Sequence, residues 1–179
     1  NGNGTFQTST TFASGEIPHE ILTADLNGDG FLDLAIATEG NFNPAAVSVL
    51  LGNGNGTFQA RVDYPTQATS AGITAGDFNL DGALDLAVSN FSANTISILL
   101  GNGNGTFQAQ TTIATGAQPY DLTAADFNAD GFLDLAVTNY GPDTVSIFPG
   151  NGDGTFLSAI DTVAPNGPNY LTAQDFDGD

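Results

Sequence analysis

Three stretches of nine residues place oxygen-bearing side chains at fixed positions, and this spacing suits the binding of a hard cation. In residues 77–85 (DFNLDGALD), Asp stands at positions 1, 5 and 9, Asn at position 3 and Gly at position 6. The same positions recur in residues 25–33 and 126–134, and a fourth copy begins at residues 175–179. Calcium takes about six to eight oxygen ligands, and these side chains with the main-chain carbonyl at position 7 could surround one ion. The sequence therefore predicts calcium loops, each with a sharp turn at its glycine.

Two other interpretations of the loops are open at this point. The helical EF-hand begins with the same residues but needs a glutamate at position 12, where this chain has Ile36, Val88 and Val137. Turns rich in Asp and Asn can also hydrogen-bond to their own backbone without any ion. The residues after each loop alternate with a period of two, as strands do. We therefore favour calcium loops that join two strands over the EF-hand.

The loops recur with a fixed period, which predicts a repeat architecture. Their first aspartates, Asp25, Asp77, Asp126 and Asp175, are 52, 49 and 49 residues apart. Four segments of the second unit have strand character: residues 73–76, 84–88, 95–100, and a fourth that opens at residues 106–108. Asn-Gly turns precede the fourth segment and favour a hairpin. Four antiparallel strands per unit of about 50 residues predict an all-β fold made of β-propeller-type blades.

We expect a single repeat array over residues 1–179. Residues 1–20 would end a preceding repeat, residues 21–72, 73–121 and 122–170 would form three repeats, and residues 171–179 would start a fourth. Because both ends fall inside a unit, the sequence is expected to be a window of a longer chain. Aromatic residues at repeated positions are expected in the core between blades, namely Phe6, Phe58, Phe107, Phe156, Phe78, Phe127 and Phe176.

The charge of the chain limits the partners that it can have. Twenty Asp and Glu oppose one basic residue, Arg61, for a net charge of −19, and twelve of the acids lie in the four loops. Nucleic acid and anionic membranes select basic surfaces, so neither is an expected partner. No apolar run approaches the length of a membrane span. The absence of cysteine excludes disulfides and thiol chemistry, and surfaces built from Asn, Thr and Ser favour an extracellular or cell-surface protein.

In these motifs the chain resembles the FG-GAP/VCBS repeat family, whose best-known members form the head of integrin α chains. Within that family it is more similar to the bacterial VCBS type. The resemblance rests on the loops, on the sequence LGNGNGTFQ at residues 51–59 and 100–108, and on the period. It covers nearly the whole chain and implies propeller blades with about one calcium ion per complete loop, between the first and second strands. The implied ligands are Asp25, Asn27, Asp29, Phe31 and Asp33, then Asp77, Asn79, Asp81, Ala83 and Asp85, then Asp126, Asn128, Asp130, Phe132 and Asp134, and, in the incomplete fourth loop, Asp175, Asp177 and Asp179.

Five other side chains are candidates for ligand binding at the propeller end opposite the loops. His19 and Tyr120 occupy the same repeat position, at the start of the first strand. Phe42, Phe91 and Tyr140 each follow an asparagine between the second and third strands. Aromatic side chains on loops can anchor a ligand, and the integrin relatives carry ligand contacts at that end. The simpler alternative is that these aromatics cover blade edges and that His19 is a solvated loop residue.

No enzymatic site is expected. The chain has one histidine, no cysteine and no lysine, so a nucleophile paired with a base is difficult to assemble. Residues 52–56 (GNGNG) are glycine-rich, but strand-like residues follow them, whereas a nucleotide-binding loop needs a helix there.

Three functions are open. The first is a calcium-stabilised extracellular module for adhesion or for recognition of a protein or ligand. The second is a structural subunit of an extracellular filament or array, because exposed strand edges can template another copy. The third is a carbohydrate-binding propeller, which the absence of tryptophan disfavours. The expected partners are copies of the chain, the rest of a larger repeat protein, or an extracellular protein or glycan.

Overall fold

Three four-stranded antiparallel sheets make up the structure, which is a computed structural model that describes residues 8–40 and 45–174. Blade 1 contains β1 (Pro18–Ala24), β2 (Asp33–Thr38), β3 (Ala46–Leu50) and β4 (Val62–Pro65). Blade 2 contains β5 (Ser70–Gly76), β6 (Asp85–Asn90), β7 (Thr95–Leu99) and β8 (Thr111–Ala114). Blade 3 contains β9 (Pro119–Ala125), β10 (Asp134–Asn139), β11 (Thr144–Phe148) and β12 (Ile160–Val163). The strands of each blade are paired in chain order, so the predicted all-β fold of four-stranded blades is confirmed.

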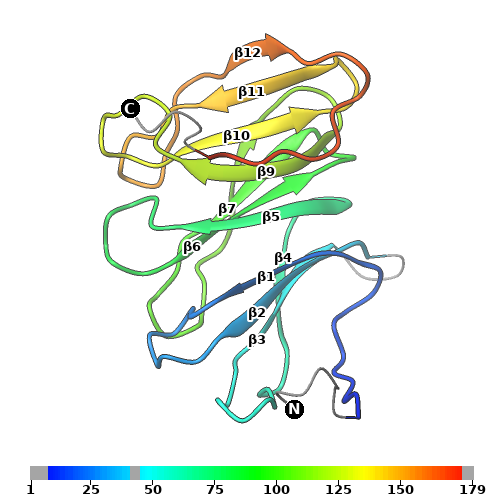
Figure 1. Cartoon of the computed structure of the whole chain (residues 1–179), viewed down its shortest axis with the longest axis vertical. Coiled ribbons are helices and arrows are strands. Elements are labelled where there is room, and N and C mark those ends of the chain that lie inside the picture. The colour runs from blue at the N-terminus through cyan, green and yellow to red at the C-terminus, as the bar shows by residue number, and fades with distance from the viewer. Residues whose placement is uncertain (1–7, 41–44, 175–179) are drawn as a thin grey trace.

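The blades stack face to face, with their first strands next to one another (Figure 1). β1 contacts β5, and β5 contacts β9. Within the described residues the three sheets form an open stack and do not close into a ring (Figure 1). The aspartate-rich loops therefore lie at one end of each blade, and the first strand begins at the other end.

The core consists of two apolar clusters, one at each junction between blades. Side chains on successive residues of a strand face opposite sides of the sheet, so Leu86 of β6 packs towards blade 1 and Ala87 packs towards blade 3. The first cluster joins Leu26, Ala35, Ala37, Val47 and Val49 to Ile73, Leu86, Val88, Leu99 and Phe107. The second joins Phe78, Ala87, Ile96 and Ile98 to Leu122, Leu135, Val137 and Phe148. Neighbouring blades thus bury the faces that one sheet alone would leave in water.

Most of the aromatic positions expected between blades are found there. Phe78 and Phe107 are buried. Phe156 packs edge-to-face on Phe78, with ring centroids 5.6 Å apart. Phe58 packs in the same way on Phe12, at 5.1 Å, but Phe12 precedes blade 1, so this pair does not lie between two described blades. Such edge-to-face pairs suit the charge distribution of aromatic rings, so they add to the apolar clusters.

Phe127 contradicts the expectation of a core position, because its side chain is 42% exposed. It shares its repeat position with Leu26 and Phe78, which are covered by the blade that follows them. No further blade covers Phe127 within the described residues, so its ring stays in contact with solvent. Phe6 and Phe176 lie outside the described residues.

The fourth strand of blade 2 begins later than the sequence predicts. Phe107 makes a single bridge, to Gly101, and the ladder resumes where Thr111 faces Ile98. Three residues, 108–110, therefore lie opposite two, 99 and 100, which is a one-residue bulge. The segment expected to open the fourth strand is instead the base of a hairpin, and β8 starts after the bulge.

The residues after β12 dock on blade 3 as the start of β5 docks on blade 1. The N–H of Leu171 donates to Oδ2 of Asp121 at 2.9 Å. At the same repeat position two blades earlier, the N–H of Ile73 donates to Oε2 of Glu20 at 2.8 Å. At both places a carboxylate of a first strand therefore bonds to the backbone at the start of the next repeat.

Candidate functional site

Each aspartate-rich loop connects the first and second strands of its blade, as predicted, and its side chains bond to its own backbone. In the loop between β5 and β6, Asp77 accepts from the N–H groups of Asp81 (3.1 Å) and Gly82 (2.9 Å). Asn79 accepts from the N–H of Asp81 at 3.0 Å, and Asp81 accepts from the N–H of Ala83 at 2.8 Å. The other two loops make the same four bonds. The three loops are thus one structure repeated.

The predicted turn at position 6 is present in all three loops. Gly30, Gly82 and Gly131 have φ of 85°, 86° and 89°, a region in which glycine carries no steric penalty. Position 4 also has positive φ, and there Leu80 and Ala129 adopt 59°. The glycine at position 6 is therefore required by the backbone, whereas position 4 tolerates a side chain in a less favourable conformation.

The aspartate at position 9 is buried and joins its loop to the hairpin that precedes the fourth strand. Asp85 is 0% exposed. Its Oδ2 accepts from the N–H of Phe78 at 2.9 Å, and its Oδ1 accepts from the N–H of Gly101 at 2.7 Å. Asp33 and Asp134 make the same two bonds. Sequence reasoning assigned position 9 only to an ion and missed this structural role.

The hairpin glycine lies so close to the loop that no side chain fits there. A Cβ on Gly101 would lie 2.2 Å from the carbonyl oxygen of Leu84. The corresponding distances are 2.3 Å at Gly52 and 2.2 Å at Gly150. A glycine two residues after the third strand of every repeat is the sequence signal for this contact.

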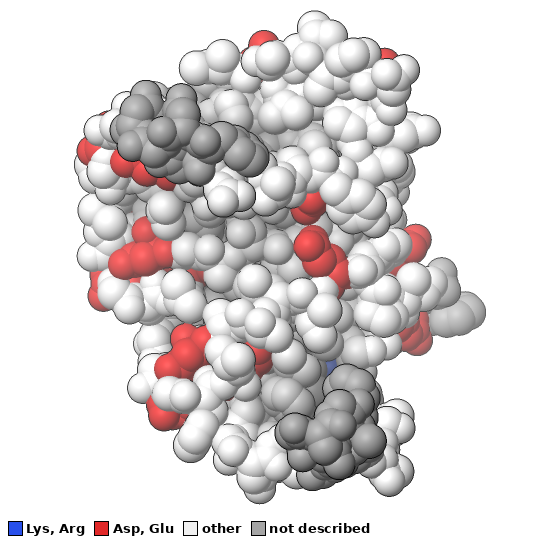
Figure 2. Space-filling model, viewed as in Figure 1, with Lys and Arg blue, Asp and Glu red and all other residues white. Residues whose placement is uncertain are grey.

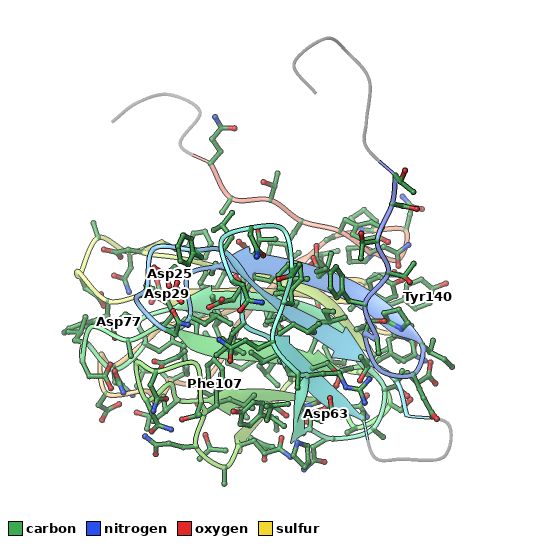
Figure 3. All side chains as sticks on the ribbon, turned by 90° about the horizontal axis from the view of Figure 1, so that it is seen from below. Asp25, Asp29, Asp63, Asp77, Phe107 and Tyr140 are labelled. Carbon is green, nitrogen blue, oxygen red and sulfur yellow. The ribbon has the colours of Figure 1, made fainter. Side chains whose placement is uncertain are left out.

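The charges in the second loop repel one another. Burial raises the pKa of Asp85 above its ordinary 3.8. The N–H groups of Gly101 and Phe78 lower that pKa, and the neighbouring charges of Asp81 and Asp77 raise it further. The three loops form acidic patches along one side of the molecule (Figure 2), where Asp25, Asp29 and Asp77 lie in Figure 3. A bound cation would oppose this repulsion.

The donor set of each loop fits a hard cation. Three carboxylates, one amide oxygen and one main-chain carbonyl are oxygen ligands of the kind that calcium prefers. Within residues 8–40 and 45–174, no three Asp, Glu or His side chains are already grouped as a metal site, and the loop carboxylates bond to backbone N–H groups. An ion would share the remaining lone pairs of these oxygens or draw them from those bonds. Asp175, Asp177 and Asp179 of the fourth loop lie outside the described residues.

The side chain at position 7 distinguishes the second loop from the others. A Cβ on Gly54 would lie 2.4 Å from the ring of Phe31, and one on Gly152 would lie 2.5 Å from the ring of Phe132. The ring thus covers the hairpin in blades 1 and 3. In blade 2 the smaller Ala83 leaves a hollow. It is lined by Asp81, Gly82, Ala83, Gly101, Asn102, Gly103 and Gln108.

A second hollow lies at the opposite end of the blades, where the first strands begin. Two of the predicted ligand residues, His19 and Tyr120, are in its wall. Sequence reasoning missed Glu20, Asp121 and Tyr170, which stand directly after them or their repeat equivalents. The wall consists of His19, Glu20, Ala71, Gly72, Tyr120, Asp121 and Tyr170. The hollow therefore combines carboxylates, an imidazole and phenol rings.

The two carboxylates of this hollow are structural as well as exposed to it. Glu20 accepts the N–H of Ile73 at 2.8 Å. Burial raises the pKa of Glu20, the bond from Ile73 lowers it, and the charge of Asp121 raises it. Asp121 accepts the N–H groups of Leu122 at 2.8 Å and Leu171 at 2.9 Å. Each carboxylate therefore uses part of its acceptor capacity on a neighbouring segment, Glu20 on β5 and Asp121 on the segment that contains Leu171.

A row of aromatic rings borders the same hollow. The ring of Tyr120 meets that of Phe91 at 6.1 Å and that of Tyr170 at 5.7 Å, both edge-to-face. Tyr140 packs instead on the backbone at Gly167, where a Cβ would lie 2.6 Å from its ring. In Figure 3, Tyr140 lies on the side away from Asp25, Asp29 and Asp77. The structure thus brings together His19, Phe91 and Tyr120 of the predicted set, and Phe42 lies outside the described residues.

The repeated loops and strands have a counterpart in a known family. A family model described as an FG-GAP-like repeat matches residues 25–88, 77–137 and 126–179, and each match begins at the first aspartate of a loop. The chain belongs to the FG-GAP-like repeat family. The three matches follow the three loops, so the period found in the sequence is the family repeat. No curated protein matches the chain.

Two solved structures are similar to the chain. One is described as the structural basis of specific recognition of non-reducing terminal N-acetylglucosamine by an Agrocybe aegerita lectin, with a TM-score of 0.54, 22% identity and coverage of 80% of this chain. The other is a Photorhabdus luminescens Tc holotoxin pore, with a TM-score of 0.47, 19% identity and coverage of 84% of this chain. The chain spans 37% and 7% of their respective lengths. The likeness to the lectin shows the fold alone. No helix long and apolar enough to cross a membrane occurs among the described residues.

Proposed function

We propose that this FG-GAP-like repeat chain is a non-enzymatic, calcium-stabilised extracellular module for adhesion or ligand recognition. The observation that carries the calcium assignment is the identical backbone of the three loops, which presents carboxylates at positions 1 and 5 and buries one at position 9. The proposed ligands are the side-chain oxygens at positions 1, 3, 5 and 9 and the carbonyl at position 7 of each loop. The fourth set would start at Asp175, Asp177 and Asp179.

Calcium in these loops would act on stability. Each ion that binds only the folded state stabilises it by about 2.7 kcal/mol when free calcium is about 100-fold above the Kd. Calcium-binding modules that work outside cells have Kd values of about 10⁻⁴–10⁻³ M. Such a protein would be most stable outside the cell, which agrees with a net charge of −19 that needs counter-ions.

Thermal unfolding with and without calcium tests this assignment. The midpoint should rise by more than about 5 °C between a chelator and millimolar calcium, since more than one ion contributes. Magnesium at the same ionic strength is the control, because its smaller size and stricter octahedral geometry suit such loops less well. Equal midpoints in chelator and calcium would refute the assignment.

We propose that the ligand binds in the hollow at the start of the first strands. It is the place where His19 and Tyr120 meet carboxylates and a row of rings, and it lies at the end of the blades away from the calcium loops. Substituting Tyr120 or His19 should weaken ligand binding without lowering the calcium-dependent midpoint by more than about 2 °C. A variant that loses both together would place the effect on folding instead of recognition.

A carbohydrate ligand is the second candidate. It is supported by the fold shared with a lectin, by the exposed ring of Tyr170 and by the half-buried ring of Tyr120 beside it, since sugars stack on aromatic faces. A glycan array that includes terminal N-acetylglucosamine would test it, with Tyr170→Ala as the variant. Binding that is absent, or that is unchanged in the variant, would remove this candidate.

Assembly with other copies or with further repeats is supported by the open face of blade 3. Phe127 is exposed on it, at a position whose equivalents, Leu26 and Phe78, are buried against the blades that follow them. Sedimentation over a range of concentrations would separate a module from a filament subunit. A monomer at all concentrations would leave the filament function without support.

A further inference from the structure

The three loops are not isolated from one another, because the hairpin of each later blade reaches back to the loop of the blade before it. The N–H of Gly105, at the tip of the blade 2 hairpin, donates to the carbonyl oxygen of Leu26 at 3.1 Å. Leu26 is position 2 of the blade 1 loop. The N–H of Gly154, in the blade 3 hairpin, donates to the carbonyl oxygen of Phe78 at 2.9 Å. Phe78 is position 2 of the blade 2 loop, so both contacts are the same bond one repeat apart.

The residue at position 2 is also tied to its own loop through position 9. The N–H of Leu26 donates to Asp33 at 2.8 Å, and the N–H of Phe78 donates to Asp85 at 2.9 Å. The other oxygen of Asp85 accepts from Gly101 at 2.7 Å, at the base of the hairpin whose tip meets Leu26. Position 9 therefore connects the loop of its own blade to the loop of the preceding blade.

The hairpin between these contacts is held by several bonds. The N–H and the side-chain amide of Asn102 donate to the carbonyl and hydroxyl oxygens of Thr106, both at 2.9 Å. The hydroxyl of Thr106 in turn donates to Asn104 at 2.6 Å. A movement at the base of such a hairpin is passed to its tip, because the segment between them has little freedom of its own.

Together these bonds form one path through all three loops; the hairpin bonds are exposed, but the ends of the path within the loops are shielded from water. Leu26 is 3% exposed, Phe78 is 2% exposed, and Asp33, Asp85 and Asp134 are 0% exposed. Hydrogen bonds in such surroundings are costly to leave unmade. A change in the position of one of these carboxylates should therefore shift the backbone of the neighbouring loop.

We propose that calcium binding in one loop strengthens calcium binding in the adjacent loops along this path. The inference rests on the proposed function, since it needs calcium to bind at all. An ion in the blade 2 loop fixes the carboxylate of Asp85, which fixes Gly101 and the hairpin above it. The tip of that hairpin then holds Leu26 and preorganises the blade 1 loop. Coupling between two binding sites is reciprocal, so the blade 1 ion favours the blade 2 ion equally.

Site-resolved calcium titration by ¹H–¹⁵N NMR tests the coupling. The amides of Gly30, Gly82 and Gly131 stand at position 6 of each loop and report on each separately. The first variant removes the middle site with the double substitution D77N/D81N. We expect the blade 1 and blade 3 loops then to bind calcium at least about fivefold more weakly, the lower end of typical coupling.

A variant with the blade 3 site removed, D126N/D130N, is the matched control. It should weaken the adjacent blade 2 loop by a similar factor and the blade 1 loop by a smaller one, because two junctions separate them. Equal weakening of both remaining loops would overturn transmission along the path and indicate a general effect of charge.

A second pair of variants breaks the path without touching any proposed ligand. Gly105 has φ of 79°, and a Cβ there would lie 2.7 Å from the side chain of Leu51, so Gly105→Ala displaces the hairpin tip from Leu26. It should reduce the coupling between the blade 1 and blade 2 loops and leave that between blades 2 and 3 intact. Gly154→Ala should do the reverse.

The outcomes separate this inference from the proposed function. If no loop of the unchanged protein responds to calcium, the proposed function fails and the coupling fails with it. If all loops bind calcium but their affinities are the same in D77N/D81N as in the unchanged protein, only the coupling is overturned. If Gly105→Ala loses the dispersed spectrum of a folded protein, the two site-removal variants decide the question alone.

Discussion

The two ends of the blades are built on opposite plans. At the loop end, every repeat makes the same bonds, down to the two N–H groups that each position 9 aspartate accepts. At the other end, a single repeat position holds Glu20, Gly72, Asp121 and Tyr170. A feature that recurs in every blade has a role common to all blades, which is to stabilise the blade. A feature that differs from blade to blade gives the molecule one particular surface, and recognition requires such a surface.

The two ends also use carboxylates differently. Position 9 aspartates connect two segments of the same blade and are fully buried. Glu20 connects β1 to β5, Asp121 connects β9 to the segment that contains Leu171, and both face a hollow. Loss of the first kind should therefore damage a blade, and loss of the second kind should loosen a junction. The following predictions test this distinction, beginning with the largest effect.

Replacing the buried aspartate of the middle loop should have the largest effect on stability. In Asp85→Asn, one side-chain oxygen can still accept from one of the two N–H groups. The NH₂ group then faces the other N–H group, where the wild-type carboxylate had an acceptor oxygen. One buried N–H is left without a partner, at a cost of about 1–3 kcal/mol, and the opposed donors add to it. We expect a loss of about 2–4 kcal/mol in urea unfolding, measured in chelator so that no ion contributes.

Asp81→Asn is the matched control for that measurement. Asp81 is in the same loop, but its bonds to Ala83 and Asn79 are exposed to solvent, so in chelator the loss should be below about 0.5 kcal/mol. In calcium both variants should lose stability, since both are proposed ligands. Equal losses in chelator would contradict a separate structural role for position 9.

The junction between blades 1 and 2 should weaken by a smaller amount in Glu20→Ala. The substitution leaves the N–H of Ile73 without its acceptor in a largely buried place. We expect a loss of about 1–2 kcal/mol in the free energy of unfolding. His19→Ala, one residue away and more exposed, should change it by less than about 0.5 kcal/mol. Similar losses in the two variants would mean that the carboxylate does not join the strands.

A third substitution tests whether the loop end is as uniform as its backbone suggests. Ala83→Phe should place a ring over Gly103, as Phe31 covers Gly54 in blade 1, and fill the hollow beside the second loop. The added apolar contact should raise the thermal midpoint by about 1–3 °C. Phe132→Ala, which opens the same hollow in blade 3, should lower it by a similar amount. A lower midpoint in Ala83→Phe would show that the two loops are not equivalent.

The sequence predicts the loop end far better than the opposite end, and the reason is physical. Loop positions 1 to 9 lie within one short segment, so local spacing alone defines which oxygens meet. The contacts of position 9 with Gly101, and of Gly105 with Leu26, depend on how a distant hairpin packs. The hollow is even harder to predict from the sequence, because Glu20, Asp121 and Tyr170 come together only through the stacking of separate blades. Even so, the repeat alignment placed His19 and Tyr120 at one position, and both line the hollow.

The exposed ring of Phe127 also shows that contacts between blades cannot be predicted from one repeat. Repeat equivalence assigns it to a core position, and its equivalents Leu26 and Phe78 are buried. Whether such a side chain is buried depends on the next blade, which is not a property of the residue or of its own repeat. Sequence periodicity thus predicts which face a side chain occupies but not whether that face is covered.

The smallest predicted effect concerns pH and again separates the two ends. Burial raises the pKa of Glu20 above its ordinary 4.5, so between 4.5 and the raised value the folded protein holds more protons than the unfolded chain. The contribution of Glu20 to stability is therefore complete below pH 4.5 and is lost as pH rises through its raised pKa. Glu20→Gln keeps an oxygen that accepts the N–H of Ile73 but does not ionise, so this loss should disappear.

Thermal midpoints between pH 4 and pH 7 in chelator would measure the difference. The unchanged protein should lose more stability over this range than Glu20→Gln, by less than about 3 °C, because Glu20 is only half-buried. All other ionisable groups are common to both proteins, so their contributions cancel in the comparison. Parallel pH profiles would mean that Glu20 is as well solvated in the folded protein as in the unfolded chain. The carboxylates at the hollow would then be free to face a ligand without any cost to the junction between the blades.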